Sequence, residues 1–340
     1  MKRAGIILGL MILIGCMTPQ TEAPHSRTEI LMNTPVEIQI FTNGSDELLD
    51  KAFDLVTDLE RRLTVNEVGS EVEDINQAAG ISPVAVSEDT FHLIERSIYF
   101  SNYSAGRFNV AIGPLTKLWS IGFDNAQRPS DAEIQSVLPL LNYTNITLDA
   151  DTQTVFLEEQ GMRLDLGAIA KGFIADEVAG LLTAHDVERA IIIVGGDLLA
   201  LGARANGDPW RIGIRNPTPN PNDEEFLIGT IPAINQAVAT SGVYGRYLEI
   251  DGVVYHHTLN WRTGFPFETD VLSISVIADT GLLAEIYTTI LFGKTIEAGL
   301  AYIESLDNVE AVLVSTNNEI YLTTGLRNDF VLIAEEFEIR

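Results

Sequence analysis

The sequence contains a single cysteine, Cys16, among its 340 residues. A disulfide needs two cysteines, so the folded part of the chain must be stabilised by its core rather than by cross-links. Basic residues are also scarce: 21 Lys and Arg stand against 48 Asp and Glu, a formal net charge of −27. This charge repels polyanions and argues against nucleic-acid binding. A small anionic ligand would need local compensation from backbone N–H groups, a metal ion or a lysine.

The sequence also lacks an apolar run of the roughly 20 residues that are needed to span a bilayer. Its N-terminal apolar run covers residues 4–14, between the basic pair Lys2–Arg3 and Gly15–Cys16. This pattern predicts a secretory signal peptide over residues 1–15, cleaved before Cys16, which would then carry a lipid. The alternative is an ordinary cysteine that ends a signal sequence. We expect residues 16–28 to form a lipidated tether and residues 29–340 to form the fold.

Removal of residues 1–15 would take away Lys2 and Arg3 and leave a net charge of −29. We therefore expect an exported protein that is anchored by its lipid to the bacterial cell envelope. Its place would be the periplasmic side of a membrane or the cell surface.

Of the residues in the chain, 46 % are hydrophobic, which is enough for a large core. Apolar periodicity predicts a helix over 46–63 with Ser45 as its N-cap. Short apolar runs predict many strands, including 162–166 and a hairpin joined by Asp251–Gly252. Neither an internal repeat nor a clean domain break is visible. We therefore expect one α+β body of mostly antiparallel sheet with packed helices.

Four stretches with glycines lie where predicted elements end, at 106–119, 165–172, 194–202 and 239–247. Glycine at such places permits positive φ and a close approach of the backbone to a ligand. Together with Lys171, the stretches are compatible with a phosphate or nucleotide cradle, and equally with ordinary turns. The two standard phosphate-binding fingerprints, G-x-x-x-x-G-K-[ST] and G-x-G-x-x-G, are absent.

A pair of histidines, His256 and His257, ends a predicted strand within YHHTLNWRTG. Neighbouring side chains on a strand point to opposite faces, so at most one of the pair serves a given site. Zinc binding would need ligands at metal spacing, and the other histidines are scattered. A general acid or base, or a structural histidine, fits better.

Glu285 and Thr289 lie four residues apart on a predicted helix over 281–292 and therefore share one helix face. They could be a solvated glutamate and an inward threonine. They could equally offer two hard oxygen ligands to a divalent cation such as Mg²⁺.

Taken in order, these stretches resemble the ApbE-type flavin transferases (FAD:protein FMN transferases), a family of exported bacterial lipoproteins. The resemblance extends from about residue 32 to 292. It implies an ApbE-like (T-fold-like) body. The matching stretches are MNT, GRFNVAIGPLTKLWSIGF, DLGAIAKGFIAD, VGGDLLALG, WRIGIRNP, ATSGVYGRY and YHHTLNWRTGFP.

The resemblance implies a chemistry. Family members bind FAD with Mg²⁺ and transfer FMN to a threonine hydroxyl of a partner, usually a membrane electron-transfer subunit, with release of AMP. It implies metal binding by Ala168 (through its carbonyl), Glu285 and Thr289, and catalysis by His257 and Lys171. The residues implied to bind the nucleotide are Met32, Asn109, Gly113, Pro114, Gly167, Lys171, Gly195, Gly196, Asp197, Thr240, Ser241, Gly242 and His257.

Several positions depart from the family pattern. Glu285 stands where Asp is usual, so its carboxylate reaches one methylene further toward a metal that demands tight geometry. Besides transfer, two other functions stay open: a Mg²⁺-dependent FAD pyrophosphatase that yields FMN and AMP, and a non-catalytic FAD-binding lipoprotein. The other departures are Asn109 for Asp, Ala111 for Thr, Val243 for Asp and Asn260–Trp261 for Asp–Pro.

Overall fold

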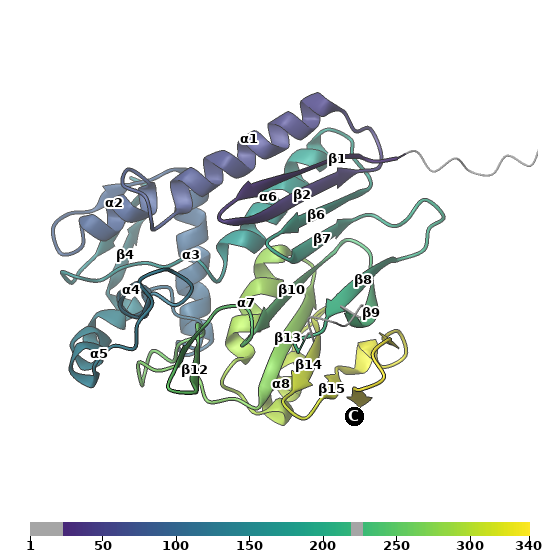
Figure 1. Cartoon of the computed structure of the whole chain (residues 1–340). Coiled ribbons are helices and arrows are strands. Elements are labelled where there is room, and N and C mark those ends of the chain that lie inside the picture. Colours follow the sequence, from purple (N-terminus) through teal and green to yellow (C-terminus); the bar gives the residue numbers. More distant parts are fainter. Residues whose placement is uncertain (1–22, 219–226) are drawn as a thin grey trace, which may run out of the picture.

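A nine-stranded sheet runs through the centre of the computed structural model, which describes residues 23–218 and 227–340 (Figure 1). Its order is β1-β2-β6-β7-β10-β13-β14-β15-β17, and only the β15–β17 pair is parallel. The predicted α+β body with a mostly antiparallel sheet is therefore confirmed. The strands are β1 (His25–Leu31), β2 (Thr34–Ile40), β6 (Ala190–Val194), β7 (Asp197–Leu201), β10 (Gln236–Gly242), β13 (Val271–Ala278), β14 (Glu310–Ser315), β15 (Glu319–Leu322) and β17 (Glu338–Ile339).

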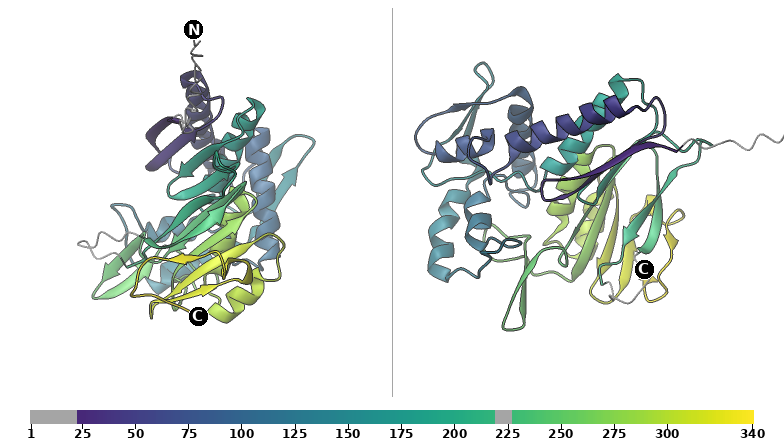
Figure 2. Two further views of the ribbon diagram at one scale, coloured as in Figure 1. Left: turned by 90° about the vertical axis from the view of Figure 1, so that its right-hand side faces the viewer. Right: turned by 45° about the horizontal axis from the view of Figure 1, so that its top comes forward.

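Both faces of this sheet are buried. In β14, Ala311 and Leu313 join the core under the helices, while Val312 and Val314 join a second core under a small sheet. This alternation explains why the four central residues of the strand, 311–314, are all apolar. The twist of the sheet is visible from the side in Figure 2. The helices are α1 (Asp46–Leu63), α6 (Ala170–Ala184), α7 (Gly281–Leu291) and α8 (Ile296–Ile303), and the small sheet consists of β8 (Trp210–Arg215), β9 (Leu227–Ala233) and β16 (Val331–Leu332).

The remaining elements lie to the left of the sheet and of α6 and α7 in Figure 1. Some of them share a local core around Trp119, whose indole Nε1 donates to Gly264 O at 2.8 Å, while others add residues such as Ile75, Phe91 and Val155 to the core under the helices. These elements are α2 (Glu71–Gln77), α3 (Glu88–Tyr103), α4 (Gly113–Trp119), α5 (Asp131–Val137), β3 (Val84–Ala85), β4 (Ile146–Asp149), β5 (Thr154–Leu157) and the hairpin β11 (Tyr247–Ile250)–β12 (Val253–His256). Three short 3₁₀ helices lie at Leu138–Leu141, Tyr143–Asn145 and Thr324–Leu326.

Local sequence signals fixed several elements correctly. Helix α1 begins after Ser45, whose side chain accepts from Leu48 N, as the predicted N-cap requires. The β11–β12 turn at Asp251–Gly252 has positive φ at both residues, as a two-residue hairpin turn of this type needs.

Two boundaries differ from the prediction. Residues 162–166 are not a strand, because they make single hydrogen bonds to loops and side chains instead of pairing with a neighbouring strand. Strand β1 begins at His25, so residues 25–28, which we assigned to the tether, are paired with β2. The predicted signal peptide, Cys16 and the tether up to residue 22 lie outside the described residues.

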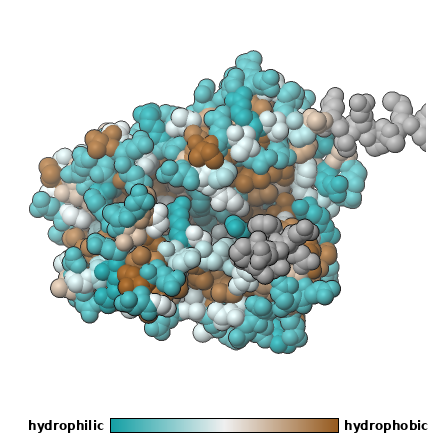
Figure 3. Space-filling model, viewed as in Figure 1, coloured by the Kyte–Doolittle hydropathy of each residue, from teal (hydrophilic) through white to brown (hydrophobic). Residues whose placement is uncertain are grey.

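The face shown in Figure 3 is mostly hydrophilic, with apolar residues in separate small groups. Among the helices that the structure describes, none combines the length and the apolar character that a bilayer crossing demands.

Candidate functional site

Lys171 lies between two carboxylates at the start of α6. Its Nζ donates to Asp197 Oδ2 at 2.5 Å, and it also donates to Glu285 Oε1. The carboxylate side chains are only 10 % and 4 % exposed, whereas that of Lys171 is 29 % exposed. The side chain of Lys171 is therefore partly exposed, while those of its acidic partners are covered.

The charges of these groups are interdependent. Burial by itself would lower the pKa of the Lys171 ammonium, but the charges of Asp197 and Glu285 outweigh this and raise that pKa above its ordinary value. Lys171 is therefore a permanent cation. Burial raises the pKa of Glu285 above its ordinary value, and the charge of Lys171 opposes this rise. With both carboxylates ionised, the three groups carry one net negative charge.

Helices α6 and α7 touch backbone to backbone at this point. A Cβ on Gly172 would lie 2.2 Å from Gly281 O, so neither helix could carry a side chain there. Glu285 of α7 accepts from Gly172 N at 2.8 Å, and Asp176 of α6 accepts from Gly281 N and Leu282 N at 2.7 and 2.9 Å. Asp176 therefore caps α7 and helps to set the position of Glu285.

Replacing Gly172 with alanine is expected to lower the free energy of unfolding by about 1–3 kcal/mol or more, because the new methyl group overpacks the contact. Gly180, on the exposed side of the same helix, provides the control: an added Cβ there meets nothing within 4 Å. Gly180→Ala should raise stability by about 0.5–1 kcal/mol. Urea denaturation of both variants tests this, and equal effects would refute the close contact.

The β6–β7 turn packs against the aliphatic part of the Lys171 side chain. Gly195 and Gly196 have φ of 61° and 97°, a conformation that glycine adopts without strain. A Cβ on Gly195 would lie 2.8 Å from Thr34 Oγ1 and 3.2 Å from Lys171 Cδ. Thr34 follows the β1–β2 turn at Met32, so this turn too lies beside the Lys171 site.

Strand β10 forms another wall. Thr240 N donates to Asp197 Oδ1 at 3.1 Å, and the Ser241 hydroxyl lies 2.8 Å from that of Thr288 on α7. Gly242 ends this strand. The segment of Thr240, Ser241 and Gly242, which is implied to bind the nucleotide, thus lies between the β6–β7 turn and α7.

The two histidines have different surroundings. His256 is buried; its Nε2 donates to Phe267 O at 2.9 Å, and its Nδ1 accepts from Thr258 N at 3.2 Å. His257 is exposed, and its Nδ1 donates to Arg246 O at 3.1 Å. This bond leaves Nε2 of His257 unprotonated and free to accept a proton.

Although His257 is exposed as a residue, the surrounding protein partly desolvates its ring and lowers its pKa, and the charges of Arg246 and Lys171 lower it further. The influence of Lys171 shows that His257 lies within electrostatic range of the ion-pair cluster. At neutral pH the imidazole is therefore an uncharged base.

Other predicted ligand residues have structural partners of their own. The Asn109 amide donates to Leu141 O at 2.9 Å and accepts from Ala111 N at 2.9 Å. Gly113, followed by Pro114 in α4, packs so closely on Arg163 that a Cβ would lie 2.7 Å from its carbonyl oxygen. Within the described part of the chain, no hydrogen bond joins these three residues to the Lys171 cluster.

Asp165, which sequence reasoning did not select, ties these segments to the start of α6. It accepts from Gly167 N at 2.8 Å and from the Thr116 hydroxyl at 2.7 Å. Asp176 and Thr288 were also missed. Both aspartates lie in the quoted stretch DLGAIAKGFIAD, which was the available signal for them.

The residues implied for a metal fit Mg²⁺ by donor type. Glu285 and Thr289 share α7, and Ala168 lies in the turn before α6, so the donors are a carboxylate, a hydroxyl and a carbonyl oxygen. Within residues 23–218 and 227–340 no group of three or more His, Cys, Asp or Glu could hold a metal ion. Among the three implied metal ligands, only Glu285 is of one of these residue types. In this structure the positive charge beside Glu285 is that of Lys171.

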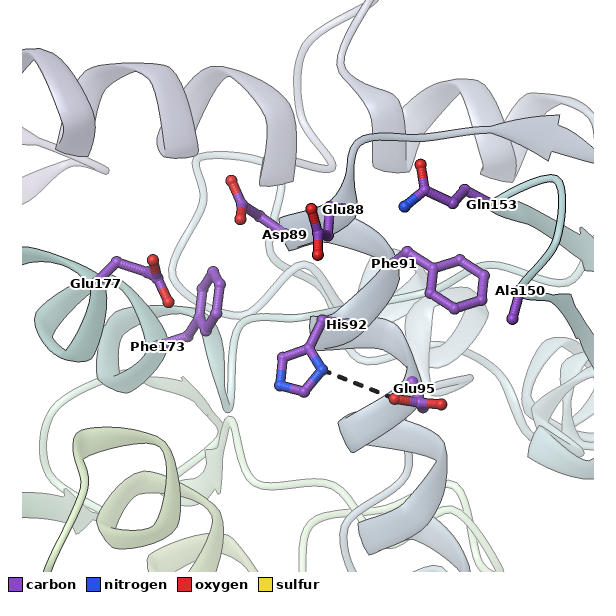
Figure 4. Close-up of a pocket in the computed structure, with 9 residues that line it drawn as sticks. All are labelled: Glu88, Asp89, Phe91, His92, Glu95, Ala150, Gln153, Phe173 and Glu177. Carbon is purple, nitrogen blue, oxygen red and sulfur yellow. Dashed lines mark ion pairs between the residues drawn. The ribbon is translucent and has the colours of Figure 1, made fainter. Parts of the chain in front are cut away.

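A separate pocket of about 340 Å³ lies between α3, α6 and the β4–β5 turn (Figure 4). Carboxylates surround His92 there, which lies 3.7 Å from Glu95. None of the predicted site residues lines it, and its negative charge is unsuited to phosphates. Its lining carboxylates are Glu88, Asp89, Glu95 and Glu177.

Comparison with known proteins identifies the family of this chain. The sequence model of the ApbE family matches residues 32–313. An FAD:protein FMN transferase from Klebsiella pneumoniae (strain 342) is 38 % identical over 315 residues, 93 % of this chain and 96 % of the relative. One from Treponema pallidum (strain Nichols) is 32 % identical over 342 residues, 95 % of this chain and 94 % of the relative.

Solved structures give the same result. The crystal structure of an ApbE protein from Thermotoga maritima has a TM-score of 0.82 at 26 % identity and covers 90 % of this chain and 99 % of its own. The flavin transferase ApbE from Vibrio cholerae has a TM-score of 0.78 at 25 % identity, with the same coverage. The family model covers most of the chain and close relatives cover nearly all of it, so this protein belongs to the ApbE family.

Proposed function

We propose that this protein is an FAD:protein FMN transferase that moves FMN from FAD to a threonine hydroxyl of a partner protein and releases AMP. Transfer of FMN from FAD to a protein is supported by the curated relatives of that name. The threonine acceptor, the release of AMP and the dependence on Mg²⁺ are our proposals. The observation that carries them is the Lys171–Asp197–Glu285 cluster, with the uncharged His257 within electrostatic range.

Charge balance supports the need for a divalent cation. The cluster has one net negative charge, and the pyrophosphate of FAD brings two more. Lys171 alone cannot neutralise this charge. Ala168, Glu285 and Thr289 would hold Mg²⁺, which when bound would neutralise charge on the pyrophosphate oxygens.

The residues of the chain would hold the substrate and move the proton. Lys171 would bind a phosphate oxygen, and the Gly195–Gly196 turn would let the backbone approach the nucleotide. The threonine oxygen forms a bond to the phosphorus of the FMN half, and the bond from that phosphorus to the bridging oxygen breaks. AMP leaves with the bridging oxygen, and the hydroxyl proton goes to Nε2 of His257.

The partner would be the threonine-bearing subunit of a membrane electron-transfer complex. This proposal agrees with the predicted signal peptide and with lipidation of Cys16, which would hold the enzyme at the cell envelope on the periplasmic side or at the cell surface. Labelling cells with a radioactive fatty acid, in wild type and Cys16→Ala, tests the anchor.

Incubation of the mature protein with FAD, Mg²⁺ and a candidate partner distinguishes the three possible functions. Transfer predicts AMP together with covalent flavin on the partner, and both should disappear when EDTA removes the metal. AMP with free FMN would indicate a pyrophosphatase instead. Bound but intact FAD would indicate a non-catalytic binding protein and would reject the proposal.

A further inference from the structure

Three basic side chains gather around a second pocket, of about 520 Å³. Arg107 and Arg262 line the pocket. Lys294 directly follows the pocket residue Gly293, and the charge of Arg107 lowers its pKa. Among residues 23–218 and 227–340, none of the three forms an ion pair with a carboxylate, although acidic residues outnumber basic ones in this chain. Glu268 is the only carboxylate that lines the pocket.

These cations are close enough that the charge of one disfavours the charged form of another. Burial lowers the pKa of Lys294, and the charge of Arg107 lowers it further. The Nε of Arg107 is buried and has no hydrogen-bond partner among the described residues. An unpartnered donor and uncompensated positive charge are both costly, and an anionic group placed between them would relieve both.

Aromatic side chains continue from this pocket along α8, α7 and α3, because the ring of Tyr302 contacts Tyr287, that of Tyr287 contacts Phe100, and that of Phe100 contacts Tyr103. Lys294 Nζ lies 4.7 Å from the Tyr302 ring centroid, and Arg262 lies 5.0 Å above Trp261. Tyr99 and Tyr103 stack at 6.0 Å and are 52 % and 49 % exposed. Tyr, Trp and Arg are the residues that contribute most to protein–protein interfaces.

The pocket adjoins the proposed transfer site. Gly293 lies in the turn directly after α7, the helix that carries Glu285 and Thr289. Phe267, another lining residue, donates its N–H to the carbonyl oxygen of Thr258, which directly follows His257 in the chain. A polypeptide bound in the pocket could therefore extend to the transfer site.

We propose that this basic–aromatic surface, formed by Arg107, Trp261, Arg262, Lys294, Tyr99 and Tyr103, binds an acidic segment of the protein that accepts FMN. The inference rests on the proposed function, because it assigns the place where the acceptor docks. The negative charge of the rest of the molecule would repel such a segment elsewhere, so the surface also orients it.

The test is a binding measurement that needs no turnover. A fluorescent synthetic peptide has a central threonine flanked by Asp and Glu; its counterpart carries Asn and Gln at the same positions. The mature wild-type protein should bind the acidic peptide about tenfold more tightly at low salt. Arg107→Gln/Arg262→Gln should abolish this preference, as should high salt. Arg204→Gln, which removes an exposed charge in the β7–β8 loop, should retain it.

Equal binding of the two peptides, or a preference that persists in the double variant, would overturn the inference. Arg262 is exposed, so Arg262→Gln alone should fold and should weaken the preference. This single variant keeps the test decisive if the double variant does not fold. Arginine-dependent binding to phosphatidylglycerol vesicles without a peptide preference would assign the surface to membranes and also overturn it. A peptide preference without any FMN transfer would instead reject the proposed function and leave the docking surface in place.

Discussion

Replacing Lys171 with alanine is expected to lower the free energy of unfolding by about 3–5 kcal/mol. The substitution removes the one cation between Asp197 and Glu285, whose side chains are almost fully covered. Two carboxylates would then face each other in a poorly solvated place without compensation. Urea denaturation, compared with Lys117→Ala at an exposed position on α4, measures the effect.

The same substitution should weaken FAD binding by about 10- to 100-fold, the equivalent of one lost charge-assisted hydrogen bond. Adding Glu285→Gln to Lys171→Ala separates the two effects. The amide removes one uncompensated charge and should restore part of the stability, while the affinity for FAD should stay low. Unchanged FAD affinity in Lys171→Ala would refute the phosphate-binding role of this lysine.

Replacing His257 with alanine is expected to lower kcat for FMN transfer by about 10²- to 10⁴-fold and to leave FAD affinity unchanged. Arg246 O holds the imidazole in the tautomer whose Nε2 can take a proton. Stopped-flow measurement of AMP release and flavin fluorescence titration give the two quantities. A loss of FAD affinity equal to the loss in rate would show that His257 binds the nucleotide instead.

The pH profile provides an independent check on His257. A base must be unprotonated, and the pKa of His257 lies below the ordinary value of 6.5. The wild-type rate should therefore fall only when the pH drops well below 6.5, and His257→Ala should lose this acidic limb. His256→Ala is the contrasting variant: it leaves Phe267 O and Thr258 N without partners and should cost about 1–3 kcal/mol of stability.

Much of the fold could be predicted because the signals were local. The Ser45 cap and the Asp251–Gly252 turn depend only on neighbouring residues, and both were placed correctly. The apolar alternation in residues 162–166 is also real, since Met162, Leu164 and Leu166 are buried. It does not make a strand there, because pairing depends on a partner that the sequence pattern cannot show. The short helices α2 and α4 were missed for a similar reason, since seven residues give little periodicity.

The candidate site shows the same division. Motif order selected Lys171, Asp197 and Glu285 individually, and the structure places them in contact. Lys171 pairs with Glu285, which lies 114 residues further along the chain. This pairing is a tertiary contact, and no local sequence pattern predicts it. The self-satisfied amide of Asn109 is another, because its partner Leu141 lies 32 residues away.

The contact between Gly172 and Gly281 limits how the enzyme can move. Two helices whose main chains already touch cannot come closer, and Asp176 of α6, which accepts from the first two N–H groups of α7, opposes their separation. We therefore expect α6 and α7 to behave as one rigid body. Any adjustment that admits a nucleotide would fall to the connecting turns, above all Gly195–Gly196. Amide hydrogen exchange should accordingly slow in that turn when FAD binds and change little along the two helices.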